Sequence, residues 1–336
     1  MNMNTLTGKM KMAFITDGGL NMGMGHVYRT LTLANEIKDV AETCVVTKGD
    51  ERVVHKLRES GRVVLEANSD HEIINHLIKI RPDVIAVDML NVEKVFAKKL
   101  KTVSNNRLIL FENLISGSNR YADVVINAVM GADFKNKKYL DRNTNTLYLY
   151  GPKYFAFKEE VYEFKKRRKV LKDRINRILL IFGASDPSDL TSLALRQLLN
   201  SDENYKIDIV VGAHFGHEKA LNSILTEYVD KKDKVFIYKD VGNVAELMFN
   251  ADVVVCSPGL SAYVALCIGT PIIVFHHNSW QKEGFKGFID TMGRNEMFKL
   301  KEMVDRGDFV DPRSGFIKEM LIGEGKREVI EAILGE

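Results

Sequence analysis

The sequence contains few cysteines and no long hydrophobic run. Its three cysteines, Cys44, Cys256 and Cys267, lie in apolar segments without CxxC spacing, which argues against a disulfide framework and a cysteine-rich zinc site. We expect buried free thiols, which suit a reducing cytoplasm. No segment approaches the roughly 18 to 20 apolar residues of a membrane span, and the N-terminal apolar run is too short for a signal peptide. The sequence therefore predicts a soluble, cytoplasmic protein.

A large net charge is also missing. The chain has 48 basic and 45 acidic side chains and a net charge of +3, so no nucleic-acid partner is predicted. The histidines of GAHFGH and HHNSWQ lack companion ligands at metal spacing, and neither a metal nor a cofactor is expected. The basic run of residues 165–177 is most simply a solvated connector. Peripheral contact with an anionic membrane or with pathway enzymes is the alternative.

Short β-branched runs alternate with longer amphipathic ones along the chain. Runs such as KMAFIT, DVIAVD and RLILF predict strands, and HVYRTLTLANEIK and HEIINHLIKI predict helices. This alternation predicts a parallel sheet with crossover helices, and it stops near residue 150 and restarts after the basic run. We therefore predict an α/β protein with two Rossmann-like domains, residues 1–150 and 151–336, facing a central cleft. Packing of the last helix back on the first domain is compatible with this prediction.

Glycines crowd the loop DGGLNMGMGHVYR, which follows the first predicted strand. The loop lacks the third glycine of a dinucleotide fingerprint and the Gly-Lys-Ser/Thr of a P-loop, so neither common phosphate motif applies. His26 would lie at a helix N-terminus, where the helix dipole and Arg29 both favour a neutral imidazole that acts as a general base. A purely structural or capping role for His26 is the alternative.

Two loops of the second half are candidates for holding a nucleotide diphosphate. FGASDPSDLT follows a strand and offers Gly183, Ser185 and Asp186 at a helix start, where a plain N-cap is the alternative. The turn SPGL precedes another apolar helix and presents backbone N–H groups at its start. Polar residues also end two strands of the first half, as Asp88 ends DVIAVD and Glu112 follows RLILF. Such positions in a parallel sheet serve function or turn capping.

In their order, these motifs resemble the UDP-sugar hydrolases of pseudaminic acid synthesis and their relatives named as spore-coat polysaccharide proteins. GMGHVYRTLTLA, VIAVDML, FGASDPSDLT and SPGLSAYVALCIGTPIIVFHHNSWQ carry the resemblance, which runs through most of the chain. It implies the two-domain GT-B fold. It also implies hydrolysis of a UDP-linked amino sugar, similar to UDP-2,4-diacetamido-2,4,6-trideoxy-altropyranose, to UDP and the free sugar in nonulosonic acid or surface polysaccharide synthesis.

The resemblance implies that His26 is the catalytic residue that activates water. Pattern and resemblance together give the candidate substrate-binding residues Gly23, Gly25, Arg29, Asp88, Glu112, Asn113 and Gln281. The candidate nucleotide-binding residues are Gly183, Ser185, Asp186, Gly259, Leu260, Ser261 and Tyr263.

The chain departs from the family pattern at two places. The family commonly has a ribose-binding glutamate three residues after Ser261, where this chain has Val264, so ribose binding would shift to neighbours such as Tyr263. Paired aspartates are replaced by Glu112 and Asn113, as in relatives associated with CMP-sugar (acylneuraminate) synthetases. A GT-B glycosyltransferase and a non-catalytic nucleotide-sugar-binding subunit stay open as alternatives, because motif spacing does not identify the acceptor.

Overall fold

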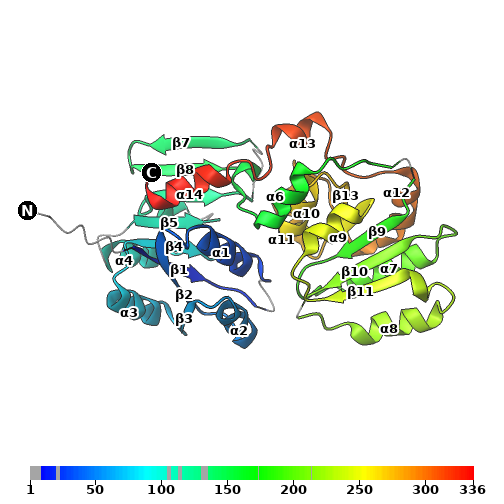
Figure 1. Cartoon of the computed structure of the whole chain (residues 1–336), viewed down its shortest axis with the longest axis horizontal. Coiled ribbons are helices and arrows are strands. Elements are labelled where there is room, and N and C mark those ends of the chain that lie inside the picture. Colours follow the sequence, from blue (N-terminus) through cyan, green and yellow to red (C-terminus); the bar gives the residue numbers. More distant parts are fainter. Residues whose placement is uncertain are drawn as a thin grey trace, which may run out of the picture. The chain divides into compact units, whose positions relative to one another are not determined.

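The structure, a computed structural model, describes residues 9–19, 23–103, 107–112, 116–129, 135–172, 174–212 and 214–336. The candidate residue Asn113 lies outside these ranges. The chain divides into two compact units, each with its own sheet (Figure 1). Unit 1 comprises the described residues of Met1–Ala128, Asn136–Ala156 and Glu324–Glu336, and unit 2 comprises those of Val129–Lys135 and Phe157–Gly323. The C-terminal segment therefore belongs to unit 1.

Unit 1 is built on an eight-stranded sheet in the order β3-β2-β1-β4-β5-β6-β8-β7. Its strands are β1 (Met10–Thr16), β2 (Ala41–Thr47), β3 (Val63–Glu66), β4 (Val84–Asp88), β5 (Arg107–Phe111), β6 (Val124–Asn127), β7 (Lys137–Asp141) and β8 (Thr146–Tyr150). All pairs are parallel except β7 with β8. The central strands are continuous apolar runs because helices bury both of their faces.

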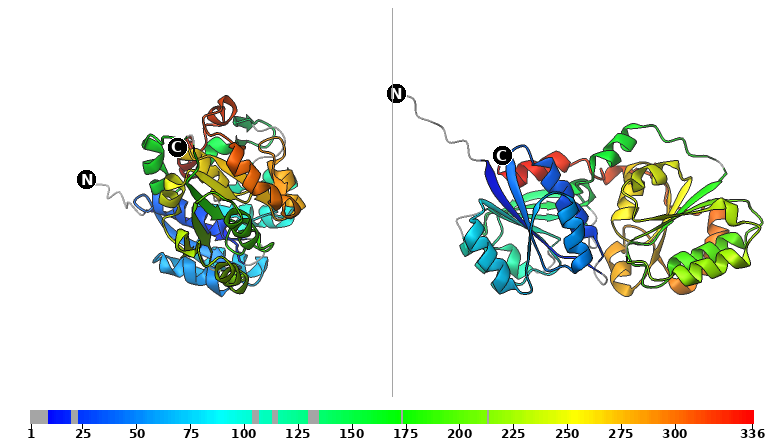
Figure 2. Two further views of the ribbon diagram at one scale, coloured as in Figure 1. Left: turned by 90° about the vertical axis from the view of Figure 1, so that its right-hand side faces the viewer. Right: turned by 60° about the horizontal axis from the view of Figure 1, so that its bottom comes forward.

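The helices of unit 1 cover both faces of its sheet. They are α1 (Gly25–Glu36), α2 (Glu51–Glu59), α3 (Asp70–Ile80), α4 (Lys94–Val103), α5 (Ser116–Asn119), the short η1 (Pro152–Tyr154) and α14 (Lys326–Leu334). Residues of α3 and α4 share a buried apolar cluster with Ile15 of β1 and Val87 of β4. The helices α1 and α14 lie on the opposite face (Figures 1 and 2).

Unit 2 is built on a six-stranded parallel sheet in the order β11-β10-β9-β12-β13-β14. Its strands are β9 (Arg177–Ile181), β10 (Lys206–Val211), β11 (Val235–Lys239), β12 (Val253–Cys256), β13 (Ile272–His276) and β14 (Met292–Gly293). Its helices are α6 (Glu159–Lys166), α7 (Leu190–Leu199), α8 (Glu218–Glu227), η2 (Lys232–Lys234), α9 (Val244–Asn250), α10 (Leu260–Cys267), α11 (Ser279–Phe285), η3 (Arg294–Lys299), α12 (Leu300–Arg306) and α13 (Gly315–Glu319).

Each sheet reverses its direction of growth at its first strand. In unit 1 the chain adds β2 and β3 on one side of β1 and then β4 on the other, and in unit 2 it does the same around β9. Ligands of open parallel sheets bind beyond the carboxyl ends of the strands at such a reversal. The predicted α/β fold with two Rossmann-like parallel sheets is confirmed, and the antiparallel strand β7 is an addition to it.

The basic run of residues 165–177 is largely paired inside unit 2. Lys169 donates to the carbonyl oxygens of Phe249 and Ala251 near the end of α9, and burial lowers its pKa to about 8. Further ion pairs join Lys172 to Asp252, Arg174 to Glu203 and Arg177 to Asp208. Much of the charge that motivated a membrane-contact alternative is thus used in holding the connector.

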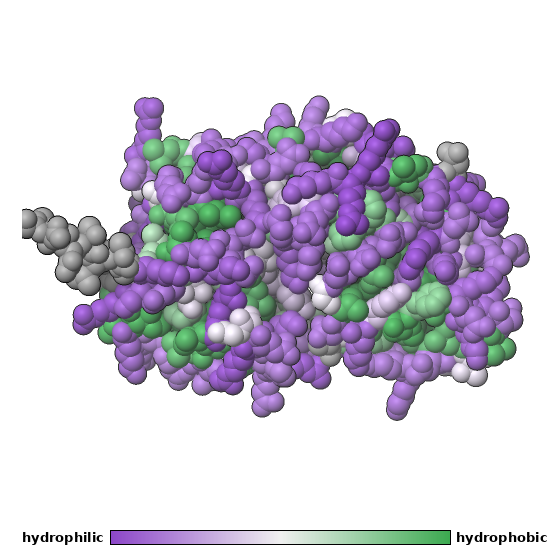
Figure 3. Space-filling view, viewed as in Figure 1, coloured by the Kyte–Doolittle hydropathy of each residue, from purple (hydrophilic) through white to green (hydrophobic). Residues whose placement is uncertain are grey.

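The described part of the chain was expected to contain no membrane-spanning helix. None of the described helices is both long and apolar enough to cross a bilayer. On the face that Figure 3 displays, hydrophobic side chains form separate small areas between hydrophilic ones. Inside the units, Cys256 and Cys267 are buried and Cys44 is partly buried, and all three are free thiols. This agrees with the expectation from sequence.

We expect α14 to be needed for the stability of unit 1. Ile333 of α14 is fully buried, and Arg107 of β5 donates to the carbonyl oxygen of Ala332 over 3.0 Å. Ile333→Ala should cost about 2 to 5 kcal/mol, because it leaves a cavity under the sheet. Thermal unfolding followed by circular dichroism measures this as a lower Tm. Arg327→Ala, at an exposed position of the same helix, is the control, and equal Tm values for the two variants would contradict the role of α14.

Candidate active site

Four ionisable side chains of unit 1 meet at the carboxyl end of β4. The parallel register places Thr16 of β1, Asp88 of β4 and Phe111 of β5 side by side at the ends of their strands. His26 and Arg29 belong to the first turns of α1, where their spacing of three residues puts both on one face of the helix. Glu112 follows β5 directly. The fold thereby brings together residues from three separate parts of the sequence.

Asp88 is the centre of this cluster. Its Oδ1 accepts a hydrogen bond from His26 Nδ1 over 2.6 Å. The guanidinium of Arg29 donates to both carboxylate oxygens of Asp88, with 2.7 Å between Nε and Oδ2. Arg29 also donates through Nη1 to Glu112 Oε1, and its guanidinium lies 5.3 Å from the centre of the Phe111 ring. Every polar end of the Arg29 side chain therefore has a partner within unit 1.

Burial makes these interactions strong. Asp88 is 1% exposed and His26 is 7% exposed, so both are largely shielded from water. Burial alone would raise the pKa of Asp88, but Arg29 and His26 lower it below its usual value, and the carboxylate is ionised. Burial alone would lower the pKa of His26, but the charge and hydrogen bond of Asp88, with the more distant Glu112, raise it above 6.5 despite Arg29. The imidazole is thus more basic than a free histidine.

This result corrects the expectation of a pKa-lowered, neutral His26. The helix N-terminus and Arg29 do favour the neutral form, but Asp88 contacts the ring directly and outweighs them. Arg29 and Asp88, which are expected from sequence to contact substrate, are hydrogen-bonded to each other, and Asp88 is hydrogen-bonded to His26. Because ionised Asp88 accepts a hydrogen bond from Nδ1, neutral His26 carries its free lone pair on Nε2.

The glycines of the first loop leave room beside the start of α1. Among the described residues, no atom lies within 4 Å of the position where a Cβ would stand on Gly23 or on Gly25. Gly18, by contrast, is packed closely against Val27 of α1, since a Cβ there would lie 2.9 Å from that side chain. Of the described loop residues, Gly18 is therefore closely packed on α1, whereas Gly23 and Gly25 have space beside them.

In unit 2, the loop between β9 and α7 combines open and engaged residues. Gly183 has a φ of +84°, a Cβ on it would meet no atom within 4 Å, and Ser185 is partly exposed. Asp186 is buried, and its two carboxylate oxygens accept hydrogen bonds of 2.8 Å from the backbone N–H groups of Leu190 and Thr191. Asp186 thus caps α7, which is the structural alternative named for it from sequence.

The helix α10 presents one face of its first turns outward. Gly259, Leu260, Ser261 and Val264 are partly exposed, and Gly259 has a φ of +148° with open space beside it. Tyr263 points the other way and is fully buried, with its ring stacked on Phe288 at 5.4 Å. Tyr263 is therefore part of the core of unit 2 and does not replace the missing glutamate as a ligand, which corrects that expectation.

Gln281 and His277 connect the loops of unit 2. The Gln281 side chain accepts from the backbone N–H of His277 over 2.8 Å and donates to the carbonyl oxygen of Pro258 over 3.4 Å. His277 Nε2 donates to the carbonyl oxygen of Phe182 over 3.0 Å. Burial lowers the pKa of His277, so the ring is neutral near pH 7. The carboxyl ends of β9, β12 and β13 are thus joined through two side chains.

His277 was considered from sequence only as a poor metal ligand, and its connecting role was missed. No local sequence pattern predicts the contact of His277 with Phe182, because the two residues are 95 positions apart in the chain. Among the described residues, no group of three or more histidine, cysteine, aspartate or glutamate side chains is placed to hold a metal ion. The candidate residues therefore form two sets, the charged cluster of unit 1 and the strand-end loops of unit 2.

The chain has relatives among proteins of known sequence. No protein-family model matches the chain. The chain is 42% identical over 329 residues to the uncharacterized protein MJ1062 of Methanocaldococcus jannaschii, with 96% of this chain covered, and it spans 66% of the length of that relative. It is 29% identical over 289 residues to the spore coat polysaccharide biosynthesis protein SpsG of Bacillus subtilis, covering 84% of this chain and 81% of SpsG.

Solved structures of low sequence identity have the same fold. MurG of Acinetobacter baumannii matches with a TM-score of 0.60 at 12% identity, covering 98% of this chain and 100% of MurG. A putative UDP-N-acetylglucosamine 2-epimerase of Listeria monocytogenes matches with a TM-score of 0.54 at 14% identity, covering 98% and 96%. Anabaena Alr3699/HepE, solved with UDP-glucose, matches with a TM-score of 0.53 at 13% identity, covering 96% and 95%. The chain is thus similar in sequence to SpsG and has the GT-B fold of these solved structures.

Proposed function

We propose that the protein hydrolyses a UDP-linked amino sugar to UDP and the free sugar, in nonulosonic acid or surface polysaccharide synthesis. The observation that carries this proposal is the buried His26–Asp88 pair near Gly23 and Gly25, which have open space beside them among the described residues. A carboxylate that holds Nδ1 fixes the tautomer and leaves Nε2 to take a proton, which is the arrangement of a general base. The similarity to SpsG supports a role in polysaccharide synthesis, and the UDP-glucose bound to HepE supports a nucleotide sugar as substrate.

In the proposed reaction, His26 Nε2 removes a proton from a water molecule. The water oxygen forms a bond to the anomeric carbon, and the bond from that carbon to the diphosphate oxygen breaks. Its electron pair leaves with UDP, and the proton remains on the imidazolium, which Asp88 stabilises through the hydrogen bond at Nδ1. Arg29 holds Asp88 in place throughout and, being fully engaged, is assigned no direct contact with the diphosphate.

The nucleotide is assigned to the strand-end loops of unit 2. Ser185, Ser261 and the backbone N–H groups at the start of α10 are the donors that this assignment uses, because they are partly exposed. The open space beside Gly183 and Gly259 allows phosphate oxygens to approach the backbone closely. Gln281 and His277 hold these loops in register. No carboxylate faces ribose at Val264, so the nucleoside is held chiefly by its diphosphate.

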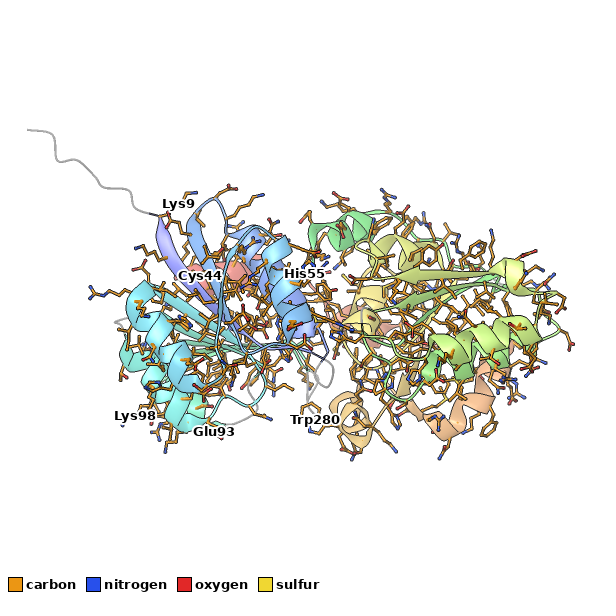
Figure 4. The ribbon with its side chains drawn as sticks, turned by 90° about the horizontal axis from the view of Figure 1, so that it is seen from below. Lys9, Cys44, His55, Glu93, Lys98 and Trp280 are labelled. Atoms are coloured by element: carbon orange, nitrogen blue, oxygen red, sulfur yellow. The ribbon has the colours of Figure 1, made fainter. Side chains whose placement is uncertain are left out.

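His26→Ala should abolish hydrolysis, with a loss of about 100-fold or more, because no other group at the cluster takes the proton. The assay is ³¹P NMR of a panel of UDP- and CMP-linked amino sugars without acceptor, in which release of the nucleotide diphosphate or monophosphate is followed. His55→Ala is the matched control, since His55 lies on α2 of the same unit with its side chain 74% exposed (Figure 4).

The same assay separates the competing functions. Release that occurs only after a sugar acceptor is added indicates a glycosyltransferase. Binding of the nucleotide sugar without turnover under any condition indicates a non-catalytic subunit. Either result would contradict the hydrolase, and so would full activity in His26→Ala.

The pH dependence of hydrolysis should follow the protonation of His26. The raised pKa means that the base form appears only as pH rises through a value above 6.5, so the rate should increase across that limb. Asp88→Asn removes the charge that raises this pKa. The limb should then move to lower pH while the maximal rate falls about 100-fold, because the tautomer is no longer fixed. A limb that keeps its position would show that another group titrates.

Introducing a carboxylate on the outward face of α10 should strengthen nucleotide binding. Val264→Glu places an acceptor where ribose hydroxyls are expected, and a hydrogen bond to a charged group is worth about tenfold or more in Kd. Isothermal titration calorimetry with UDP measures the change. Val170→Glu, at a position 75% exposed in the connector of the same unit, is the matched control. Unchanged or weaker binding in Val264→Glu would place the ribose elsewhere.

A further inference from the structure

Glu112 occupies a strained position at the edge of the charged cluster. Its φ of +48° lies in the left-handed region, where a residue with a side chain is strained. In an extended strand, Phe111 and Glu112 would point to opposite faces of the sheet. The turn at Glu112 instead lets both contact Arg29, the ring through its face and the carboxylate through Nη1. Such strain persists where the surrounding contacts hold it in place.

The charges of the cluster do not balance when His26 is neutral. Asp88 and Glu112 then contribute two negative charges against the single positive charge of Arg29. Protonation of His26 brings the sum to zero, and a buried group of charges is most stable when it is neutral as a whole. The positive charge of Arg29 balances the negative charge of Asp88. Protonation of His26 then balances the remaining negative charge, that of Glu112.

The imidazole has a defined set of charged neighbours. Asp88 from β4, Glu112 from the end of β5 and Arg29 from α1 itself are the charged groups that act on it. The neighbouring strand β1 ends in the uncharged Thr16, and α2, which contacts α1, buries apolar residues such as Val53. The ion pair of α14 with α1, Lys326 with Glu36, lies at the other end of the helix. Glu112 is thus the outermost member of a short chain that ends at His26.

We infer that Glu112 is a positioning residue for His26: it holds Arg29 against Asp88, and its negative charge favours the protonated imidazole. Glu112 was expected to bind substrate, and its contact with Arg29 gives it a different task. The inference deepens the proposed function, since it concerns the base of that reaction. Its test, however, needs no substrate and no turnover.

The experiment is a titration of the His26 imidazole by NMR in protein labelled with ¹³C at histidine. The chain has eight histidines, and the His26 signal is assigned by its loss in His26→Ala. Glu112→Gln keeps an oxygen that accepts from Arg29 Nη1 but removes the charge. The midpoint of the His26 titration should fall by about one pH unit. A structural role without the charge would leave the midpoint where it is.

Glu93→Gln is the matched control, because it removes a carboxylate from the surface of the same unit, just before α4 (Figure 4). A midpoint unchanged in Glu112→Gln, or shifted equally in Glu93→Gln, would overturn the inference. If Glu112→Gln fails to fold, Glu112→Asp and Glu112→Asn are compared instead, because their side chains have equal length and differ in charge. His26 should then titrate at a higher pH in Glu112→Asp than in Glu112→Asn. If the unsubstituted protein hydrolyses the nucleotide sugar but Glu112→Gln leaves the His26 midpoint unchanged, only the inference is refuted. If Glu112→Gln shifts the midpoint but the unsubstituted protein has no hydrolase activity, only the proposed function is refuted.

Discussion

The paired hydrogen bonds between Arg29 and Asp88 are the interaction on which the unit 1 site depends. Both groups are buried, and an isolated charge in that position would cost several kcal/mol, so each is tolerated only with the other. The pair fixes α1 against the end of β4. Because His26 lies on the same face of α1 as Arg29, its ring is delivered to Asp88 in one orientation. Tautomer, basicity and position of the imidazole therefore follow from one ion pair.

The strand-end loops of unit 2 are held without a buried ion pair of this kind among the described residues. Its titratable residues near the strand ends are used to hold backbone: Asp186 caps α7, and His277 fixes the end of β13 to that of β9. What remains at the surface is backbone N–H, hydroxyl groups and space beside Gly259. A polyanion suits donors of this kind because N–H groups at a helix start carry partial positive charge. In the proposed reaction, unit 1 would supply the proton-transfer groups and unit 2 the neutral donors.

Most of the fold could be predicted from the sequence because it depends on local patterns. Continuous apolar runs identify the buried parallel strands, and the restart of the alternation after residue 150 identifies the second sheet. The hairpin of β7 and β8 was not predicted, since β7 reads KKYLD and is mostly exposed. The site was predicted only in part. The dipole argument for a neutral His26 used neighbours in sequence, while the contact that decides its protonation comes from 62 residues away. Tyr263 failed similarly, because periodicity on a short apolar helix does not say which face is buried.

A base that resides in a cluster with surplus negative charge meets two opposing demands. The surplus makes Nε2 a stronger proton acceptor, which lowers the barrier to activating water, but it also keeps a proton on Nε2 up to a higher pH. A base is most effective when its pKa lies near the working pH, where both demands are met in part. Asp88 alone would serve orientation and tautomer. The added Glu112, reached through Arg29 rather than by direct contact, shifts the balance by a smaller step than a carboxylate touching the ring would. The separation between a carboxylate and the His26 ring therefore sets how far that carboxylate raises the pKa of the base. A distant carboxylate such as Glu112 changes this pKa without changing the contacts of the ring.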